Sequence, residues 1–156
     1  MRAVIQRVDG ASVEVEGKVI GSFEGPGLMV LVGVSVDDDE SKCAPLADKI
    51  WRLRIFEAEA LRARGLKVNS ESVEVAAVDA RLPILLISQF TLFADTSKGR
   101  RPTWQQAARG PQAEPLVNGV ARALRDLGAV VETGKFGADM RITQVCDGPM
   151  TVTVEV

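Results

Sequence analysis

Residues 84–91, ILLISQFT, place four consecutive apolar residues ahead of a polar end. A short apolar run that follows a proline, here Pro83, is typical of a strand buried on both faces. Residues 28–34, LMVLVGV, have the same character and predict a second buried strand. Because helices or another sheet must cover both faces of such strands, this stretch favours a layered α/β domain.

Toward the N-terminus the pattern changes to strict alternation. Val4–Val8 and Ala11–Val15 alternate around Asp9-Gly10, which predicts a β-hairpin. Residues 19–23 can extend the same sheet, and Gly25-Pro26-Gly27 predicts a turn before the buried strand.

Two amphipathic helices are expected, over residues 39–54 and 111–127, the second ended by Gly128. The acidic run Asp37–Glu40 precedes the first helix and admits two interpretations, metal binding or the start of the helix. We favour the helix start, because acidic residues there complement the backbone dipole.

The remaining residues predict further strands over 129–132, 140–145 and 151–156, and a short strand among Val73, Val75 and Val78. Together these elements predict a single domain over residues 1–156. Its expected architecture is a layered β/β/α sandwich of mixed sheets with two main helices.

Bulk composition is that of a globular protein, with 46% hydrophobic and 26% charged residues. No apolar run approaches the roughly 20 residues that cross a bilayer, and the alternating, charged start predicts no signal or transit peptide. Cys43 and Cys146 are interpreted as reduced thiols of a cytoplasmic protein. Since the net charge is −2, any RNA binding must rely on a local basic patch.

The chain contains no histidine. A Ser-His-Asp or Cys-His triad and imidazole-based zinc sites are therefore excluded. Catalysis must use carboxylates, lysines, a thiol or hydroxyl, backbone amides, or a group on the substrate. We expect no metal and no cofactor.

Candidate catalytic residues stand where the buried strand ends: Ser88, Gln89, Phe90 and Thr91. One interpretation is that these polar groups satisfy the local backbone. The other is a site in which hydroxyls and backbone N–H groups face a carbonyl. Farther along, Cys146-Asp147-Gly148-Pro149 has the composition of a β-turn between two strands.

A basic loop holds Lys98, Arg100 and Arg101 near Trp104. This composition suits RNA binding through phosphate contacts and stacking, and it equally suits a solvated loop.

Four stretches resemble the D-aminoacyl-tRNA deacylase (D-tyrosyl-tRNA deacylase) family. They are Gln6-Arg7-Val8, residues 88–94 (SQFTLFA), residues 134–140 (GKFGADM) and Gly148-Pro149-Met150-Thr151. The resemblance extends in order over nearly the whole chain. It departs from the family at Cys146, where Asn is usual, at Met150, where Val is usual, and over residues 57–83.

The resemblance implies a homodimer with active sites at the subunit interface, hydrolysing the ester of D-aminoacyl-tRNA and of glycyl-tRNA mischarged on tRNA-Ala. Gly148 and Pro149 of one subunit, joined by a cis peptide, would present their carbonyls to the substrate ammonium in the other subunit. Arg7 would brace them, and Met140 would join the substrate-binding residues. Residues 88–91 would form the pocket floor.

The resemblance implies one of two mechanisms: attack by the Thr91 hydroxyl, or attack by a hydroxyl of the RNA's terminal ribose, with the Phe90 N–H stabilising the oxyanion. Because a threonine nucleophile needs a base and none is obvious here, we favour the second mechanism. Chirality would then be sorted by rejection of L side chains against the Gly-Pro backbone.

Two alternatives stay open. One is a related deacylase acting chiefly on glycine or L-alanine mischarged onto tRNA; Arg7 favours the D-specific branch. The other is a dimeric RNA-binding module without catalysis.

Overall fold

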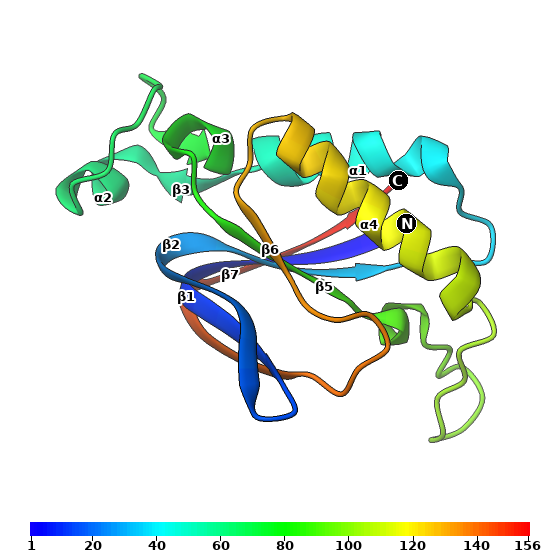
Figure 1. Ribbon diagram of the computed structural model, residues 1–156. Coiled ribbons are helices and arrows are strands. Elements are labelled where there is room, and N and C mark those ends of the chain that lie inside the picture. Colours follow the sequence, from blue (N-terminus) through cyan, green and yellow to red (C-terminus); the bar gives the residue numbers. More distant parts are fainter.

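The computed structural model describes residues 1–156 and is built on a five-stranded mixed sheet with the order β6-β5-β2-β1-β7 (Figure 1). The strands are β1 (Arg2–Val15), β2 (Lys18–Gly33), β5 (Ile84–Ser88), β6 (Val131–Thr133) and β7 (Arg141–Glu155). Strands β2, β5 and β6 run parallel, whereas β1 is antiparallel to both of its neighbours, β2 and β7. A separate antiparallel ribbon pairs β3 (Arg54–Glu57) with β4 (Glu74–Ala76).

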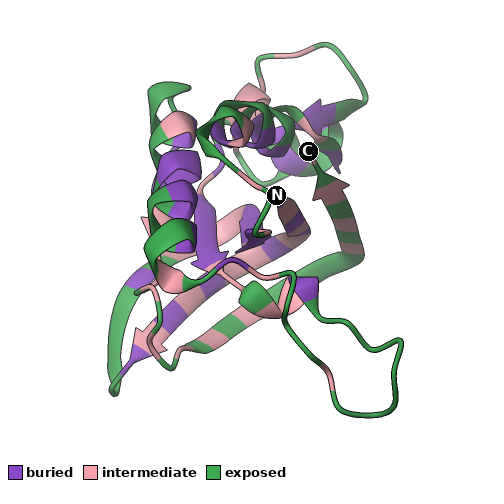
Figure 2. Ribbon diagram, turned by 90° about the vertical axis from the view of Figure 1, so that its right-hand side faces the viewer, coloured by how far each residue is buried: buried purple, intermediate pink, exposed green.

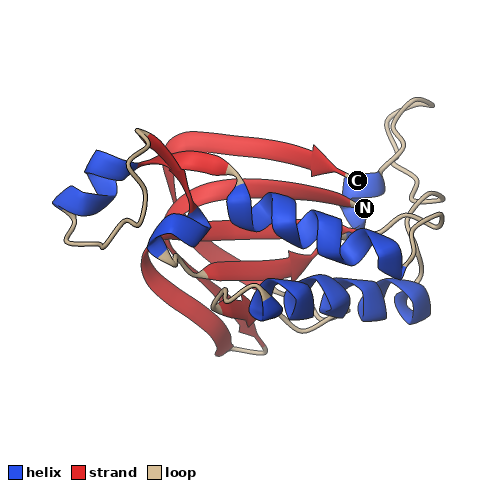
Figure 3. Ribbon diagram, turned by 90° about the horizontal axis from the view of Figure 1, so that it is seen from above, coloured by secondary structure: helices blue, strands red, loops and turns tan.

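Helices α1 (Cys43–Arg52) and α4 (Gly110–Asp126) lie side by side over one face of this sheet (Figure 3). Their apolar sides and the central strands form a core cluster of 30 buried residues, and the buried surfaces meet between helices and sheet (Figure 2). Shorter pieces complete the chain: the 3₁₀ turns η1 (Glu40–Lys42) and η2 (Phe90–Phe93), α2 (Ala58–Ala63) and α3 (Ala77–Ala80). The predicted layered α/β class is confirmed.

The long β1–β2 ribbon bends over the opposite face of the central strands. Here the sequence prediction was wrong, because Asp9-Gly10 is not a hairpin turn: it lies inside β1, where the pairing with β2 shifts and Gly10 has φ +94°. The turn is formed by Glu16 and Gly17, both with positive φ, as a two-residue hairpin of this twist requires. Asp-Gly supplies a bulge instead, which bends a strand as readily as a turn ends one.

Gly25-Pro26-Gly27 is likewise not a turn but part of β2, with Pro26 opposite Asp9. Both strands therefore bend at the same level. The bend brings the distal half of the ribbon over Leu85 and Ile87, and a second cluster of six buried residues forms between the two halves: Val8, Ala11, Val13, Met29, Leu85 and Ile87.

The two C-terminal strands predicted over 140–145 and 151–156 are one strand, β7. Val8 pairs with Cys146 and Gln6 with Thr151, so residues 147–150 bulge out opposite the single residue Arg7. The predicted β-turn is thus a bulge, because β1 continues past it and re-forms the ladder on both sides.

The predicted helices are present with small differences at their ends. Asp39 caps the 3₁₀ turn that precedes α1, its carboxylate accepting from the Ser41 N–H at 2.9 Å. Gly128 follows α4 with φ +91°, as expected of a helix stop. Residues 57–81 contain α2 and α3 as well as the expected short strand, β4. None of the helices combines the length and apolarity needed to span a membrane.

Candidate functional site

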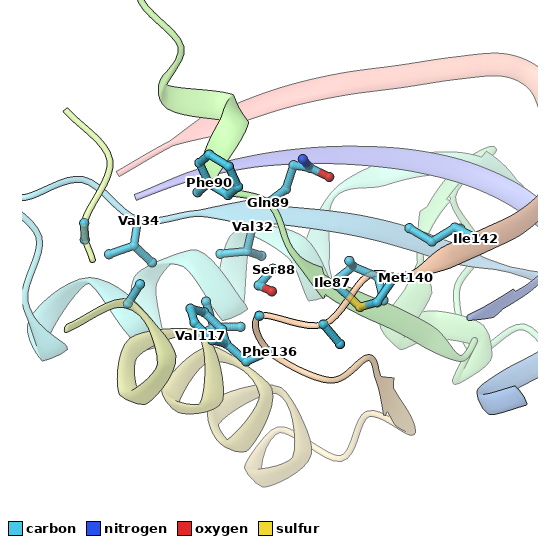
Figure 4. Close-up of a pocket in the computed structure, with 14 residues that line it drawn as sticks. Val32, Val34, Ile87, Ser88, Gln89, Phe90, Val117, Phe136, Met140 and Ile142 are labelled. Carbon is cyan, nitrogen blue, oxygen red and sulfur yellow. The ribbon is translucent and has the colours of Figure 1, made fainter. Parts of the chain in front are cut away.

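A cavity of about 300 Å³ opens at the carboxyl ends of the parallel strands β2 and β5 (Figure 4). Strand ends of this kind are the usual ligand sites of α/β sheets, because the connecting loops diverge there. Helix α4 forms one wall, and the segment after β6 folds back as another. The lining residues are Val32, Val34, Ile87, Ser88, Gln89, Phe90, Ala108, Ala113, Val117, Phe136, Gly137, Ala138, Met140 and Ile142.

None of these 14 side chains is ionisable. The cavity therefore contains no general base or acid of its own, and no carboxylate that could pair with a substrate ammonium. Its polar groups are those of Ser88 and Gln89 and the backbone that follows them. Chemistry in this cavity must come from hydrogen-bond donors and acceptors and from the substrate itself.

Three of the four predicted catalytic residues, Ser88, Gln89 and Phe90, line the cavity, where β5 passes into η2. The first hydrogen bond within η2 runs from the Leu92 N–H to the Gln89 carbonyl, 3.2 Å. The N–H groups of Phe90 and Thr91 precede it and have no acceptor within the turn. This local geometry leaves two backbone donors at the end of a buried strand.

Thr91, the fourth predicted catalytic residue, is half-buried beside the cavity and does not line it. Its hydroxyl accepts a hydrogen bond from the Gln89 amide nitrogen. An amide nitrogen donates and cannot take up a proton at neutral pH, so the structure gives the Thr91 hydroxyl no base.

The thiols are also unsuited to nucleophilic attack in this cavity. Cys43 is buried between α1 and α4, where its Sγ lies 3.4 Å from the Leu116 carbonyl oxygen. Burial raises the pKa of the Cys43 thiol, which keeps it protonated at neutral pH. Cys146 is exposed on β7 and accepts from the Gln144 amide at 3.3 Å.

The Gly148-Pro149 bulge lies away from this cavity within one chain. The peptide between the two residues is cis. Arg7, on the neighbouring strand, pairs with Leu28, which pairs with Ile84 at the start of β5. The cavity begins at the other end of β5, four residues or about 13 Å farther along the strand.

Arg7 holds the base of the bulge from one side. Its Nε lies 3.1 Å from an Asp147 carboxylate oxygen and donates to the Asp147 carbonyl at 3.3 Å. Its NH1 donates to the Ile55 carbonyl at 2.7 Å, which ties the bulge to the β3 ribbon. The Arg7 side chain is 15% exposed and Asp147 is 54% exposed. Arg7 thus contacts the residue before Gly148 and lies close to Gly148 itself, although Gly148 and Pro149 are exposed.

Lys98, Arg100 and Arg101 lie in an exposed loop that follows η2 and projects from the body, in yellow-green in Figure 1. Met140, which the sequence predicted to bind substrate, is among the residues that line the cavity. The structure therefore brings residues 88–90 and Met140 together, and it places the basic loop after Phe90. It leaves Arg7, Gly148 and Pro149 at a different place on the same chain.

Sequence reasoning missed the walls of the cavity. Val32 and Val34 looked like ordinary strand residues, and Ala113 and Val117 like the apolar side of a helix. Phe136 and Ala138 lie in the GKFGADM stretch, so the motif held a signal that they are close to the site. Nothing local distinguishes the other wall residues from core.

Comparisons with known proteins find one family along nearly the whole chain. The model of the family described as D-Tyr-tRNA(Tyr) deacylase matches residues 4–155. The chain is 52% identical over 156 residues to the D-aminoacyl-tRNA deacylase of Streptomyces coelicolor, covering 100% of both chains. It is 50% identical over 155 residues to the D-aminoacyl-tRNA deacylase of Kineococcus radiotolerans, covering 99% of both.

Two solved structures share the fold. One, described as c-Myc DNA Unwinding Element Binding Protein, superposes with a TM-score of 0.86 at 35% identity, covering 100% of this chain and 99% of that one. The other, described as a probable eukaryotic D-amino acid tRNA deacylase, gives a TM-score of 0.80 at 16% identity, covering 99% and 98%.

Proposed function

This chain belongs to the D-Tyr-tRNA(Tyr) deacylase family, and from that premise we propose how its cavity carries out the reaction. The activity is hydrolysis of the ester bond of D-aminoacyl-tRNA, which releases free tRNA and the D-amino acid. The proposal concerns the residues that bind the substrate, the source of the catalytic groups, and the assembly.

The observation that carries the proposal is a cavity without ionisable side chains beside two backbone N–H groups that have no acceptor within η2. We place the ester carbonyl at the start of η2, with its oxygen toward the Phe90 N–H. That donor would stabilise the oxyanion, an interaction worth about 3 kcal/mol in acyl transfer. Ser88 and Gln89 would orient the ester, and Met140 would contact the substrate.

The substrate supplies the remaining chemistry. An aminoacyl ester stands next to a free hydroxyl on the same ribose, which we propose assists the attack of water on the carbonyl. The ester C–O bond then breaks, the ribose oxygen leaves with a proton, and the water oxygen stays on the amino acid. Thr91 acts as a hydrogen-bonding partner that orients this end of the site, because its hydroxyl has no base. No metal or cofactor enters the scheme.

The substrate ammonium needs acceptors, and one chain's cavity offers no carboxylate to pair with it. We propose that they are the Gly148 and Pro149 carbonyls of a second copy, with Arg7 bracing the bulge through Asp147. A ligand fixed by its ammonium and its ester carbonyl has one direction left for its side chain. An L side chain would meet the bulge backbone and be rejected, whereas a D side chain or the hydrogen of glycine would fit. The same site would therefore accept glycyl-tRNA mischarged on tRNA-Ala.

Strand β7 supports a homodimer. It has 15 residues, pairs on one side with β1 and has no strand on its other side. Long free edges of this kind are usually covered by another element or chain. On its inner face Met150, Val152 and Val154, with Val156 just after the strand, are only partly buried although they pack on the main core. A second copy at this edge would complete their burial.

Lys98, Arg100 and Arg101 are proposed to contact tRNA phosphates. We place the reaction in the cytoplasm, where aminoacyl-tRNA is consumed by translation, as a quality-control step against D-amino acids.

The decisive experiment compares D- and L-aminoacyl-tRNA carrying the same side chain, incubated with the pure protein in the presence of a metal chelator. We expect release of the D-amino acid and survival of the L ester. Equal loss of both esters would contradict sorting by steric exclusion.

Two other functions are tested in the same assay. Faster release of glycine or L-alanine from mischarged tRNA than of D-amino acids would identify the related deacylase activity. Binding of tRNA without turnover of any ester would identify an RNA-binding module. The solved structure with a TM-score of 0.86 is described, by its name only, as a nucleic-acid-binding protein, the c-Myc DNA Unwinding Element Binding Protein.

A further inference from the structure

Phe90 and Trp104 form an exposed aromatic pair at the mouth of the cavity. Their ring centroids are 5.6 Å apart with an interplanar angle of 68°, an edge-to-face arrangement. Phe90 is 56% exposed and Trp104 is 40% exposed. Large aromatic side chains normally bury their faces, and contiguous exposed apolar surface in a globular protein commonly marks an interaction site.

Trp104 sits within the most basic stretch of the chain, and Phe90 precedes that stretch. Residues 96–113 contain four cations, Lys98, Arg100, Arg101 and Arg109, and no acidic residue, although the net charge of the whole chain is −2. All four cations are exposed, and none takes part in an ion pair. Unpaired positive charge beside exposed aromatic rings is the composition that binds single-stranded nucleic acid.

Backbone hydrogen bonds hold Trp104 in place. Asp95 and Thr103 exchange two of them, at 2.8 and 3.0 Å, which closes the basic loop just before Trp104. After it, the Val36 N–H donates to the Gln106 carbonyl at 3.0 Å, and the Ala108 N–H to the Val34 carbonyl at 2.9 Å. The backbone at Trp104 is therefore held between the loop and the cavity, since Ala108 lines the cavity.

The base of the loop has its own support. The Asp95 carboxylate accepts from the Ser97 N–H at 2.9 Å, and hydrogen bonds from Ser97 lower the pKa of that carboxyl below its ordinary value of 3.8. Asp95 thus remains a charged acceptor at neutral pH, at the base of the loop that carries Lys98, Arg100 and Arg101.

We propose that the Phe90–Trp104 pair is a stacking platform for a nucleobase of the single-stranded 3′ end of the substrate tRNA, with the adjoining phosphates on the basic loop. The order along the surface matches such a strand: cations, then aromatic faces, then the cavity for the ester. This inference rests on the proposed function, and it assigns to Trp104 a positioning role that the ester-binding residues do not supply.

The chain contains two tryptophans, and the second gives an internal reference. Trp51 is 2% exposed in the core, whereas Trp104 is on the surface. A trinucleotide RNA of sequence CCA, titrated into the native protein, should quench and shift the Trp104 part of the emission and leave the Trp51 part unchanged. In Trp104→Phe the quenching should vanish while CCA still inhibits deacylation, because phenylalanine stacks but does not emit at this wavelength.

Measuring KM and kcat separately distinguishes loss of substrate positioning from loss of folded protein. Because stacking of a base on Trp104 would contribute to substrate binding, Trp104→Ala should raise KM for D-aminoacyl-tRNA roughly 10-fold, with kcat little changed. Trp104→Phe should return KM most of the way to the native value. Leu127→Ala is the matched control, since Leu127 is also 40% exposed but stands at the far end of α4.

Native KM in Trp104→Ala, or no quenching by CCA at concentrations that inhibit the native protein, would overturn the proposal. Emission of Trp104 that changes on dilution without RNA would overturn it in favour of a protein interface. The outcomes are separable from those of the proposed function: if the native protein hydrolyses no D-aminoacyl-tRNA but CCA still quenches Trp104, the platform stands and the assigned activity fails.

Discussion

At the scale of single residues, the contacts of Thr91 and Arg7 bear most directly on the proposed mechanism. The Thr91 hydroxyl accepts from the Gln89 amide, and the cavity beside it has no ionisable group. Arg7 joins the Asp147 carboxylate to the Ile55 carbonyl, so one side chain ties the exposed bulge of β7 to the β3 ribbon. The first contact argues against a covalent mechanism, and the second explains how an exposed bulge can keep one geometry.

Replacing Thr91 by alanine distinguishes the two mechanisms. If the hydroxyl orients the site, Thr91→Ala loses about 10-fold or less in kcat, because one neutral hydrogen bond is worth about 1 kcal/mol. If it were the nucleophile, the loss would be about 10⁴-fold or more. The measurement is single-turnover deacylation of D-aminoacyl-tRNA.

Thr91→Ser keeps the hydroxyl and serves as the control for a change of side-chain volume. A near-complete loss in Thr91→Ala, with native activity in Thr91→Ser and unchanged circular dichroism of both, would support the nucleophile.

At the scale of elements, the cavity depends on the way α1 and α4 pack. Gly119 of α4 is buried against Cys43 of α1, where an added Cβ would lie 2.8 Å from the Cys43 Sγ. The close approach lets Ala113 and Val117, on the same helix, reach the cavity. The position of the helix over the strand ends thus rests on one small residue.

We expect Gly119→Val to destabilise the fold by about 2 kcal/mol, in the range observed for overpacked cores. Thermal unfolding followed by circular dichroism measures the effect. Asn118→Val is the matched control, because Asn118 is the exposed neighbour on the same helix and should change stability by a few tenths of a kcal/mol.

The clash can also be removed from the other side. Cys43→Ala deletes the sulfur, so the double variant should recover part of the stability that Gly119→Val loses, a coupling expected of residues in contact. Strictly additive effects would show that the two helices do not meet through this pair.

At the scale of the whole molecule, the question is which copy completes the cavity. The bulge of one chain is separated from its own cavity by the length of β5, and β7 offers a free edge. A second copy that brings its bulge to this cavity would give two equivalent sites related by a twofold axis, as the symmetry of homodimers requires.

Mixing two inactive variants tests this arrangement. Gly148→Val damages the bulge, because Gly148 has φ +122° and an added Cβ would lie 3.0 Å from Arg7 NH2. Ala138→Phe fills the cavity from a loop position. A mixed dimer would contain one site built from the intact cavity of the first chain and the intact bulge of the second.

After unfolding and refolding the two variants together, we expect about a quarter of the native activity, since half of the dimers are mixed and each has one intact site. Each variant refolded alone is the control. Activity of the mixture equal to the sum of the two separate samples would mean that each chain completes its own cavity.

Much of this molecule could be read from local sequence. The buried strands at residues 28–34 and 84–88, the helices α1 and α4, and the motif residues 88–91 follow from apolar periodicity and from turn and cap chemistry, which act over a few residues. The missing histidines excluded whole classes of mechanism before any fold was known. The family resemblance pointed to the substrate.

Tertiary structure decided what depends on residues far apart in the chain. Asp9-Gly10 and Gly25-Pro26-Gly27 have turn composition but became bends, because glycine's freedom at positive φ serves a bulge and a turn equally, and the choice depends on whether a partner strand continues alongside. The cavity walls were invisible for the same reason: Val34 and Val117 are 83 positions apart and become neighbours only when α4 packs across the strand ends. Local composition can indicate a strand, a helix or a bend, whereas the walls of a cavity form only when distant segments of the chain pack together.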